Sequence, residues 1–245
     1  AIAFLKQALA RNPGNANALV LLGSVELANG FPDRAIENFT TAVKAQPKDP
    51  IGYQALADLY LRQKNFDEAV KVMRAGIQQQ PDAVSLQVSL AGAMEQQEDY
   101  EAAISQYQSM LEKQPGNLIV ANNLASLLLD HRTDRSSLDK AQSIAAMLRK
   151  SQIPQFKDTL CWAKYRQGDV NTAIPLCEEA AAALPDQAAV RYHLGMGYVA
   201  IGRSDKALEQ LKKALELSPN GKLADAIRST LKRISEPPAP SGKPS

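Results

Sequence analysis

Prolines recur along this chain at a fixed interval. The six prolines of the series are Pro13, Pro47, Pro81, Pro115, Pro185 and Pro219. The first four are evenly spaced, the last two are separated by the same interval, and the gap between Pro115 and Pro185 is close to twice that interval. Self-similarity at such a period indicates stacked supersecondary units, each packing only against its neighbours, rather than one layered globular core.

Two further series keep the same register. One is a leucine followed by a small residue, and its members are Leu22-Gly23, Leu56-Ala57, Leu90-Ala91, Leu124-Ala125, Leu160-Cys161 and Leu194-Gly195. The other is an alanine placed after the small residue, and its members are Ala35, Ala69, Ala103, Ala173 and Ala207, with Ala141 displaced in the fourth unit. Small residues at fixed places let two helices approach closely, so enlarging one of them to leucine is expected to cost ~1–3 kcal/mol by overpacking.

Each unit has the pattern of two helices. In one unit, Asp49 is placed to cap a helix whose first position is Pro50, where the missing N–H costs no hydrogen bond. A polar turn follows, and apolar residues then recur at helical spacing, as in Ala69, Val70 and Met73. Aromatic residues make up only 5% of the chain, and alanine, a strong helix former and weak strand former, replaces part of the usual large core residues. The sequence therefore predicts an all-α fold.

The three series together resemble the tetratricopeptide repeat (TPR), a helix–turn–helix unit whose length matches the interval between the prolines. The resemblance is strong at the small positions, weak at the position of the repeat's tryptophan, and covers residues 1 to about 219. It implies an all-α, right-handed superhelical solenoid built from antiparallel helix pairs.

The repeat register also divides the chain. Residues 1–14 match the second helix of a truncated preceding repeat, so we expect further repeats upstream in a longer protein. Residues 15–221 are predicted to form six repeats, with a long inter-helix loop over residues 130–140 in the fourth, interpreted either as a tolerated insertion or as a binding edge. Residues 222–234 are predicted to form a C-terminal capping helix, and the Pro-rich residues 235–245 a disordered tail.

Charge and composition narrow the functional classes. The chain carries 28 Lys+Arg against 26 Asp+Glu, and a net charge of +2 without a basic run predicts no nucleic-acid partner. The apolar stretches are too short to span a bilayer, so no direct membrane span is expected. The two His and two Cys residues are not spaced as metal ligands, and no nucleophile elbow, phosphate loop or dinucleotide fingerprint occurs. We therefore expect no metal site, no cofactor, no catalytic residues and no enzymatic activity.

By resemblance, the first helices of the repeats line a concave groove that binds a protein or peptide segment of a partner. In the first two units the groove places hold Asn17, Val20, Ser24, Leu27, Ile51 and Arg62, together with two members of the candidate site. The candidate site is Gln54, Asp58, Asn122, Ser126, Asp158, Trp162, Tyr165, Arg166, Tyr192 and Met196. It is weighted toward the C-terminal units because Trp, Tyr and Met dominate hot spots and adaptable interfaces.

Trp162, the single tryptophan, has two interpretations. With Tyr165 and Tyr192 it forms an aromatic floor for a bound peptide, or it packs against neighbouring helices as part of the framework. The run Asp158–Trp162 (DTLCW) resembles a D-T-L-G-W run common in bacterial TPR proteins, which favours the framework interpretation.

Cys161 and Cys177 fall on the two helices of one unit. They are either two buried thiols or a disulfide. A disulfide requires Cα atoms within about 7 Å of each other and matters only in an oxidising compartment.

Two functional hypotheses remain. The first is a non-enzymatic scaffold that binds a partner segment in the groove, and the second is a structural module that self-associates or spaces domains of a larger envelope protein. The runs Leu160–Gly168 and Tyr192–Gly202 resemble those of Gram-negative TPR proteins of exopolysaccharide assembly and export. That resemblance implies a periplasmic or outer-membrane-associated location, while the residues themselves leave a cytoplasmic location open.

Overall fold

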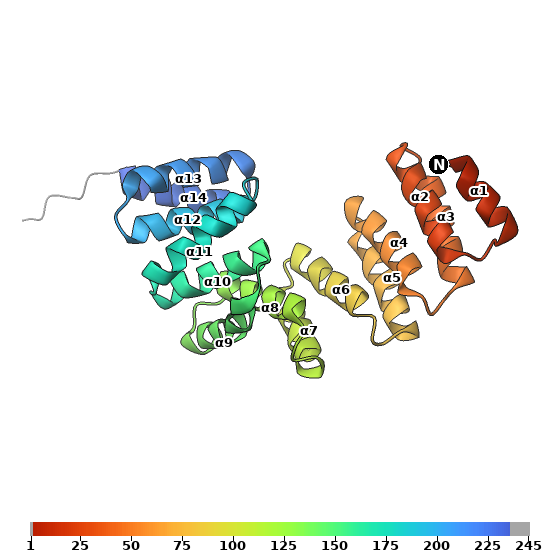
Figure 1. The fold of residues 1–245 in the computed structure, drawn as a ribbon, viewed down its shortest axis with the longest axis horizontal. Helices are drawn as coiled ribbons and strands as arrows, with labels where there is room; N and C mark the ends of the chain where they lie inside the picture. The colour runs from red at the N-terminus through yellow and green to blue at the C-terminus, as the bar shows by residue number, and fades with distance from the viewer. Residues whose placement is uncertain (1, 236–245) are drawn as a thin grey trace, which may run out of the picture. The chain divides into compact units, whose positions relative to one another are not determined.

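The computed structural model describes residues 2–235, which form fourteen α-helices, one short 3₁₀ helix and no strand, as the sequence predicts (Figure 1). The chain divides into two compact units, residues 1–116 and residues 117–245. The predicted disordered tail lies outside the described residues, except for Ser235, which ends the last helix.

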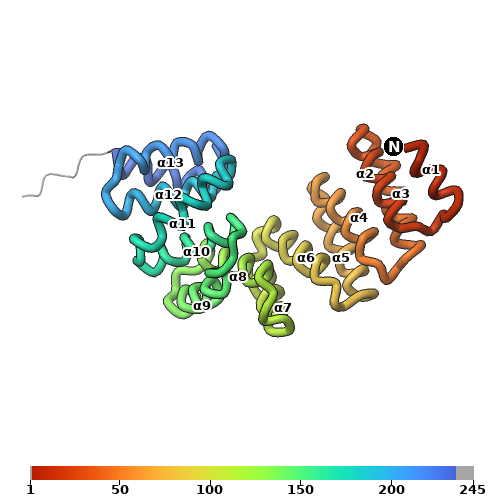
Figure 2. Tube along the Cα trace, viewed as in Figure 1, coloured from red at the N-terminus to blue at the C-terminus, as the bar shows by residue number. Residues whose placement is uncertain are grey.

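The first unit contains seven helices that run antiparallel in pairs joined by tight turns (Figure 2). They are α1 (Ile2–Arg11), α2 (Ala16–Ala28), α3 (Pro32–Ala45), α4 (Pro50–Arg62), α5 (Phe66–Gln79), α6 (Val84–Gln96) and α7 (Tyr100–Lys113). Within each pair the helices pack closely, and α4 also contacts both α2 and α6. The first helices of successive pairs therefore lie side by side and form one continuous surface.

The turns between paired helices repeat one backbone conformation. Gly30, Lys64 and Glu98 hold the same place in three successive repeats, and each adopts a left-handed φ, of 82°, 57° and 61° respectively. Glycine adopts this conformation without strain, whereas Lys64 and Glu98 do so at a small energetic cost. In two of these turns the following residue caps the next helix: the Asn65 side chain accepts from the Glu68 amide, and the Asp99 side chain accepts from the Ala102 amide. The backbone conformation of the turn thus repeats with the same period as the prolines.

Small residues set the distance between neighbouring helices. A methyl group on Gly52 of α4 would lie 2.9 Å from the backbone nitrogen of Val43 in α3, closer than non-bonded contact allows. Gly92 of α6, by contrast, has no atom within 4 Å of the corresponding point. The two glycines therefore form a matched pair, one required by packing and one not.

We expect Gly52→Ala to lower the free energy of unfolding by ~1–3 kcal/mol, because α3 and α4 must separate. Gly92→Ala should be neutral or should raise it by up to ~1 kcal/mol, since alanine is the better helix former. Urea denaturation of both variants beside the wild type measures the difference. Equal effects of the two substitutions would contradict the close packing of α3 against α4.

The second unit also consists of antiparallel pairs, closed by a last helix (Figure 1). Its elements are α8 (Leu118–His131), α9 (Arg135–Ala145), the 3₁₀ helix η1 (Ala146–Lys150), α10 (Pro154–Gln167), α11 (Val170–Ala183), α12 (Ala188–Ala200), α13 (Ser204–Leu217) and α14 (Lys222–Ser235). The residues predicted to cap the array form α14, which contacts α12 and α13 and buries Ala224 and Ile227. Ile227 packs with Leu211 and Ala214 of α13.

The prediction of a long inter-helix loop over residues 130–140 is wrong. Helix α8 continues to His131 and α9 begins at Arg135, so the connection is as short as the turns within the helix pairs of the first unit. Asp134 caps α9 by accepting from the Ser137 amide at 2.9 Å, which lets the helix begin a turn earlier relative to Ala141. The extra residues therefore form a turn of helix at the start of α9, and the 3₁₀ helix η1 follows directly at its C-terminal end.

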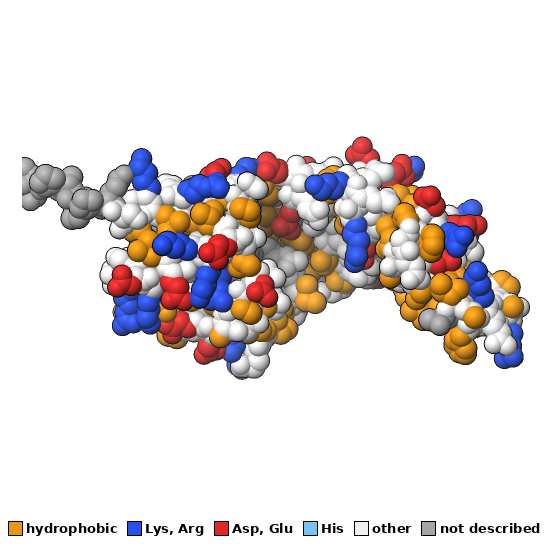
Figure 3. All heavy atoms as spheres, turned by 90° about the horizontal axis from the view of Figure 1, so that it is seen from above, with side chains coloured by type: hydrophobic (Ala, Val, Ile, Leu, Met, Phe, Trp, Pro, Cys, Tyr) orange, Lys and Arg blue, Asp and Glu red, His pale blue; other side chains and the backbone are white. Residues whose placement is uncertain are grey.

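On the face seen in Figure 3, acidic and basic side chains are interspersed over both units. This distribution matches the near-neutral net charge of +2.

Candidate partner-binding site

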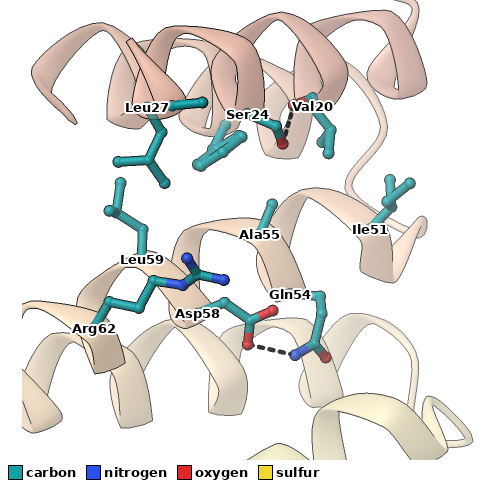
Figure 4. A pocket seen from close by; sticks show the side chains of 11 residues that line it. Val20, Ser24, Leu27, Ile51, Gln54, Ala55, Asp58, Leu59 and Arg62 are labelled. Atoms are coloured by element: carbon teal, nitrogen blue, oxygen red, sulfur yellow. Dashed lines mark hydrogen bonds between the residues drawn. The ribbon is translucent and has the colours of Figure 1, made fainter. Parts of the chain in front are cut away.

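A pocket of about 520 Å³ opens between α2 and α4 in the first unit (Figure 4). Its apolar walls include Val20 and Leu27 of α2 and Ile51 and Leu59 of α4, with Phe39 of α3 also lining it. Seven of its lining residues hold the groove places that the repeat register assigns to the first two units: Val20, Ser24, Leu27, Ile51, Gln54, Asp58 and Arg62. A cavity with apolar walls and few polar groups is the usual form of a binding site.

The polar side of this pocket is held in a fixed geometry. Gln54 donates from Nε2 to Asp58 Oδ1 at 2.8 Å and to Ser89 Oγ of α6 at 2.8 Å. Figure 4 shows the Gln54–Asp58 bond on the α4 side of the pocket. Both predicted site residues of the first unit are thus brought together, and Ser89, which the sequence analysis did not single out, orients them.

Trp162 lies in a stack of rings in the second unit and is only 7% exposed. Its ring is 4.8 Å from that of Tyr165 on the same helix and 4.3 Å from that of His193 on α12, both nearly parallel to it. Tyr192 lies 5.9 Å away in a tilted arrangement. The structure therefore supports the framework interpretation of Trp162, while half-buried Tyr165 and Tyr192 remain at the edge of the stack.

Hydrogen bonds tie this stack to the end of α8. Trp162 Nε1 donates to Asp130 Oδ1 at 2.9 Å. Arg166 donates to the backbone carbonyls of Leu129 and, at 2.9 Å, Arg132, and its guanidinium lies 5.8 Å from the centre of the Trp162 ring. Predicted site residues on α10 thus satisfy the free carbonyls at the C-terminus of α8, which is a structural role.

The remaining candidates of the second unit also have intramolecular partners. Asn122 Oδ1 accepts from the Thr159 hydroxyl at 2.8 Å, and Ser126 contacts Asp130 at 3.5 Å. Met196 Sδ is 3.8 Å from the Thr230 hydroxyl of α14. Together with the bonds of Trp162 and Arg166, these contacts form the polar layer of the second unit, in which the predicted residues are largely engaged with partners inside the fold.

His193 is the residue of this layer that the sequence analysis missed. It is buried, and its Nδ1 lies 3.0 Å and 3.1 Å from the two carboxylate oxygens of Asp158. In the sequence, His193 lies inside a predicted helix with no other candidate ligand or catalytic residue beside it. The one signal for the pair is their separation, because Asp158 precedes His193 by one repeat and one residue.

Burial disfavours the charged imidazolium and is the largest single influence on His193. The attraction to Asp158, their hydrogen bond and the attraction to Asp130 together outweigh it and raise the pKa of His193 above its ordinary value of 6.5. Because the folded pKa is the higher one, protonated His193 stabilises the fold fully below the unfolded pKa of about 6.5 and loses that contribution as pH rises through the folded pKa.

We therefore expect the stability difference between wild type and His193→Gln to shrink as pH rises from about 5.5 to about 8.5. Urea denaturation of both proteins at several pH values measures this difference. A difference that grows with pH would show that His193 is held neutral in the fold.

Cys161 and Cys177 form a disulfide between α10 and α11, with their Cα atoms 5.3 Å apart. Both residues are fully buried, in a core that includes Leu194 and Tyr198 of α12. The sequence left open whether the two cysteines are buried thiols or a disulfide, and the structure contains the disulfide.

None of the helices in residues 2–235 combines the length and apolar composition needed to cross a membrane. In the same residues, no three His, Cys, Asp or Glu side chains converge as a metal site would require.

Comparison with known proteins identifies the repeat. The family model of the cytochrome c-type biogenesis protein H TPR domain matches residues 2–118, and a second tetratricopeptide repeat model matches residues 164–231. No curated protein has a significantly matching sequence.

Solved structures share the fold at low sequence identity. The APC/C hetero-tetramer Cut9–Hcn1 superposes with a TM-score of 0.73 at 16% identity over 95% of this chain, which spans only 45% of that one. PilF of Pseudomonas aeruginosa gives a TM-score of 0.67 at 16% identity, covering 90% of this chain and 99% of its own. A tetratricopeptide repeat protein of Parabacteroides merdae gives 0.63 at 18% identity, covering 96% and 91%. The repeat register, the helix pairs and both family matches thus agree on tetratricopeptide repeats over residues 2–118 and 164–231.

Proposed function

We propose that this protein is a non-enzymatic scaffold whose first unit binds a segment of a partner protein in the pocket between α2 and α4. One observation carries the proposal: the pocket of about 520 Å³ is lined by seven residues at the groove places of two successive repeats. An apolar cleft between two parallel ridges of helix accepts the side chains of a helical or extended segment.

The polar layer of the second unit supports this choice of pocket. There the aromatic and charged side chains have partners within the fold, so they contribute stability and orientation. In the first unit, Val20, Leu27 and Ile51 line the pocket with partly exposed apolar side chains. A partner that covers them removes this apolar area from water.

We further propose that the protein acts in an oxidising compartment such as the bacterial periplasm, in the assembly of other envelope proteins. Two observations support this location. Buried disulfides such as Cys161–Cys177 persist mainly in oxidising compartments. The first unit also matches a TPR domain of cytochrome c-type biogenesis, and neither family match names exopolysaccharide export.

A pull-down from a lysate of the source organism tests the proposal with two matched variants. Ser24→Trp places a bulky side chain in the pocket, because the exposed Ser24 lines it. Thr41→Trp on α3 is the control, since Thr41 is also exposed and bonds its own helix in the same way, at 2.8 Å.

The proposal predicts that Ser24→Trp loses a partner that wild type and Thr41→Trp retain. Retention by all three proteins would contradict binding in this pocket. Light scattering of the purified protein tests the second hypothesis, self-association, which predicts a mass that rises with concentration.

A further inference from the structure

The Asp58 carboxylate lines the pocket between α2 and α4 and has no ion-pair partner in residues 2–235. Its Oδ1 accepts from Gln54, whereas Oδ2 accepts no hydrogen bond from any residue in the described range 2–235. Neither Asp58 nor Arg62 takes part in an ion pair within that range. A half-buried carboxylate beside apolar walls loses hydration, and a cation brought to Oδ2 offsets that loss.

Apart from Arg62, the polar residues that line the pocket with Asp58 have their side-chain donors engaged. Gln54 commits its amide nitrogen to Asp58 and Ser89, and its buried Oε1 has no partner. Ser24 donates its hydroxyl hydrogen to the Val20 carbonyl at 2.8 Å. The oxygens around the pocket thus remain acceptors, with the exposed Arg62 guanidinium as the one charged donor among the lining residues.

From this arrangement we propose that the pocket selects a partner segment in which a large aliphatic side chain stands next to a lysine or arginine. The aliphatic side chain fills the space between Val20 and Leu27 on one wall and Ile51 and Leu59 on the other. The cationic group pairs with Asp58 Oδ2, and its methylene stem covers apolar wall. This inference rests on the proposed function and adds the chemistry of the partner.

Arg62 provides the opposing alternative. It lies one helical turn beyond Asp58 on the same helix, and Figure 4 shows its exposed side chain reaching toward the Asp58 carboxylate. If the partner's charge were negative, Arg62 rather than Asp58 would bind it. Substituting Asp58 and Arg62 separately therefore distinguishes a partner with a positive charge from one with a negative charge.

Selection of a random-peptide library on the immobilised 245-residue chain tests the proposal. Enriched peptides are synthesised, and their affinities are measured by fluorescence anisotropy for wild type, Asp58→Asn, Arg62→Gln and Ser24→Trp. Circular dichroism verifies that each variant keeps its helical content. We expect an aliphatic residue beside Lys or Arg in the enriched peptides, a loss of about tenfold in affinity for Asp58→Asn, and no loss for Arg62→Gln.

Acidic enriched peptides, or peptides that lose affinity for Arg62→Gln and not for Asp58→Asn, would overturn this inference. If Ser24→Trp abolished the binding of these peptides, the result would still support binding in the pocket and would contradict only the proposed partner chemistry. Enriched peptides that bind Ser24→Trp as tightly as wild type, or a library without binders, would contradict the proposed function itself.

Discussion

Replacing Trp162 with alanine is expected to lower the free energy of unfolding of the second unit by about 3–5 kcal/mol. The indole is nearly buried, stacks on Tyr165 and His193, and donates to Asp130 at 2.9 Å. Its removal leaves a cavity between α10 and α12 and an aspartate without its donor. The same change would also disturb any partner binding, so it cannot by itself identify a binding residue.

Trp162→Phe is the matched control, because phenylalanine keeps an aromatic ring in the stack and loses mainly the indole N–H. We expect it to cost about 1 kcal/mol for the lost hydrogen bond, plus part of the ring's packing. Urea denaturation followed by circular dichroism measures both variants. A Trp162→Ala protein as stable as wild type would show that the indole is a solvent-facing binding residue after all.

Removing the disulfide is expected to lower the free energy of unfolding by about 3 kcal/mol. The bridge closes a segment with a sequence separation of 16 residues, and it fixes α10 against α11. Cutting it increases the conformational freedom of the unfolded chain, while Cys161→Ala/Cys177→Ala also removes two fully buried sulfur atoms from the core. Denaturation of wild type with and without a reducing agent, and of the double variant, measures the effect.

Titration of thiols in the denatured protein is the companion measurement. Oxidised protein should show no free thiol from this pair, and reduction should reveal two. Two free thiols in protein isolated from its native compartment, with no effect of reductant on stability, would contradict a structural disulfide and the oxidising location proposed from it.

The repeat register predicted most of the fold because it reflects packing between neighbouring helices. Gly195, for example, was expected to permit close approach, and a methyl group there would lie 2.8 Å from the Leu211 side chain. The same register placed Val20, Ile51 and Asp58 on one surface, where they line a pocket. Close helix packing and the shared groove surface both depend on residues that recur once per repeat, and this recurrence is visible in the sequence.

Other features depend on which side chains share a local environment, and the period does not encode this. Trp162 was weighted as an interface residue by its type, but Asp130, His193 and Arg166 surround it and make it part of the framework. The displaced Ala141 indicates a loop when only the repeat period is considered, because the period does not show that Asp134 caps an early start of α9. The disulfide likewise required the distance between Cys161 and Cys177.

The central claim is that a partner segment occupies the pocket between α2 and α4. Site-specific photocrosslinking in the source organism tests it most directly, with a photoreactive amino acid placed at Ser24 in one protein and at Thr41 in another. The account predicts a crosslinked partner from Ser24 and none from Thr41. Crosslinking from Thr41 with none from Ser24 would contradict the account, because the partner would then contact the outer helices rather than the pocket.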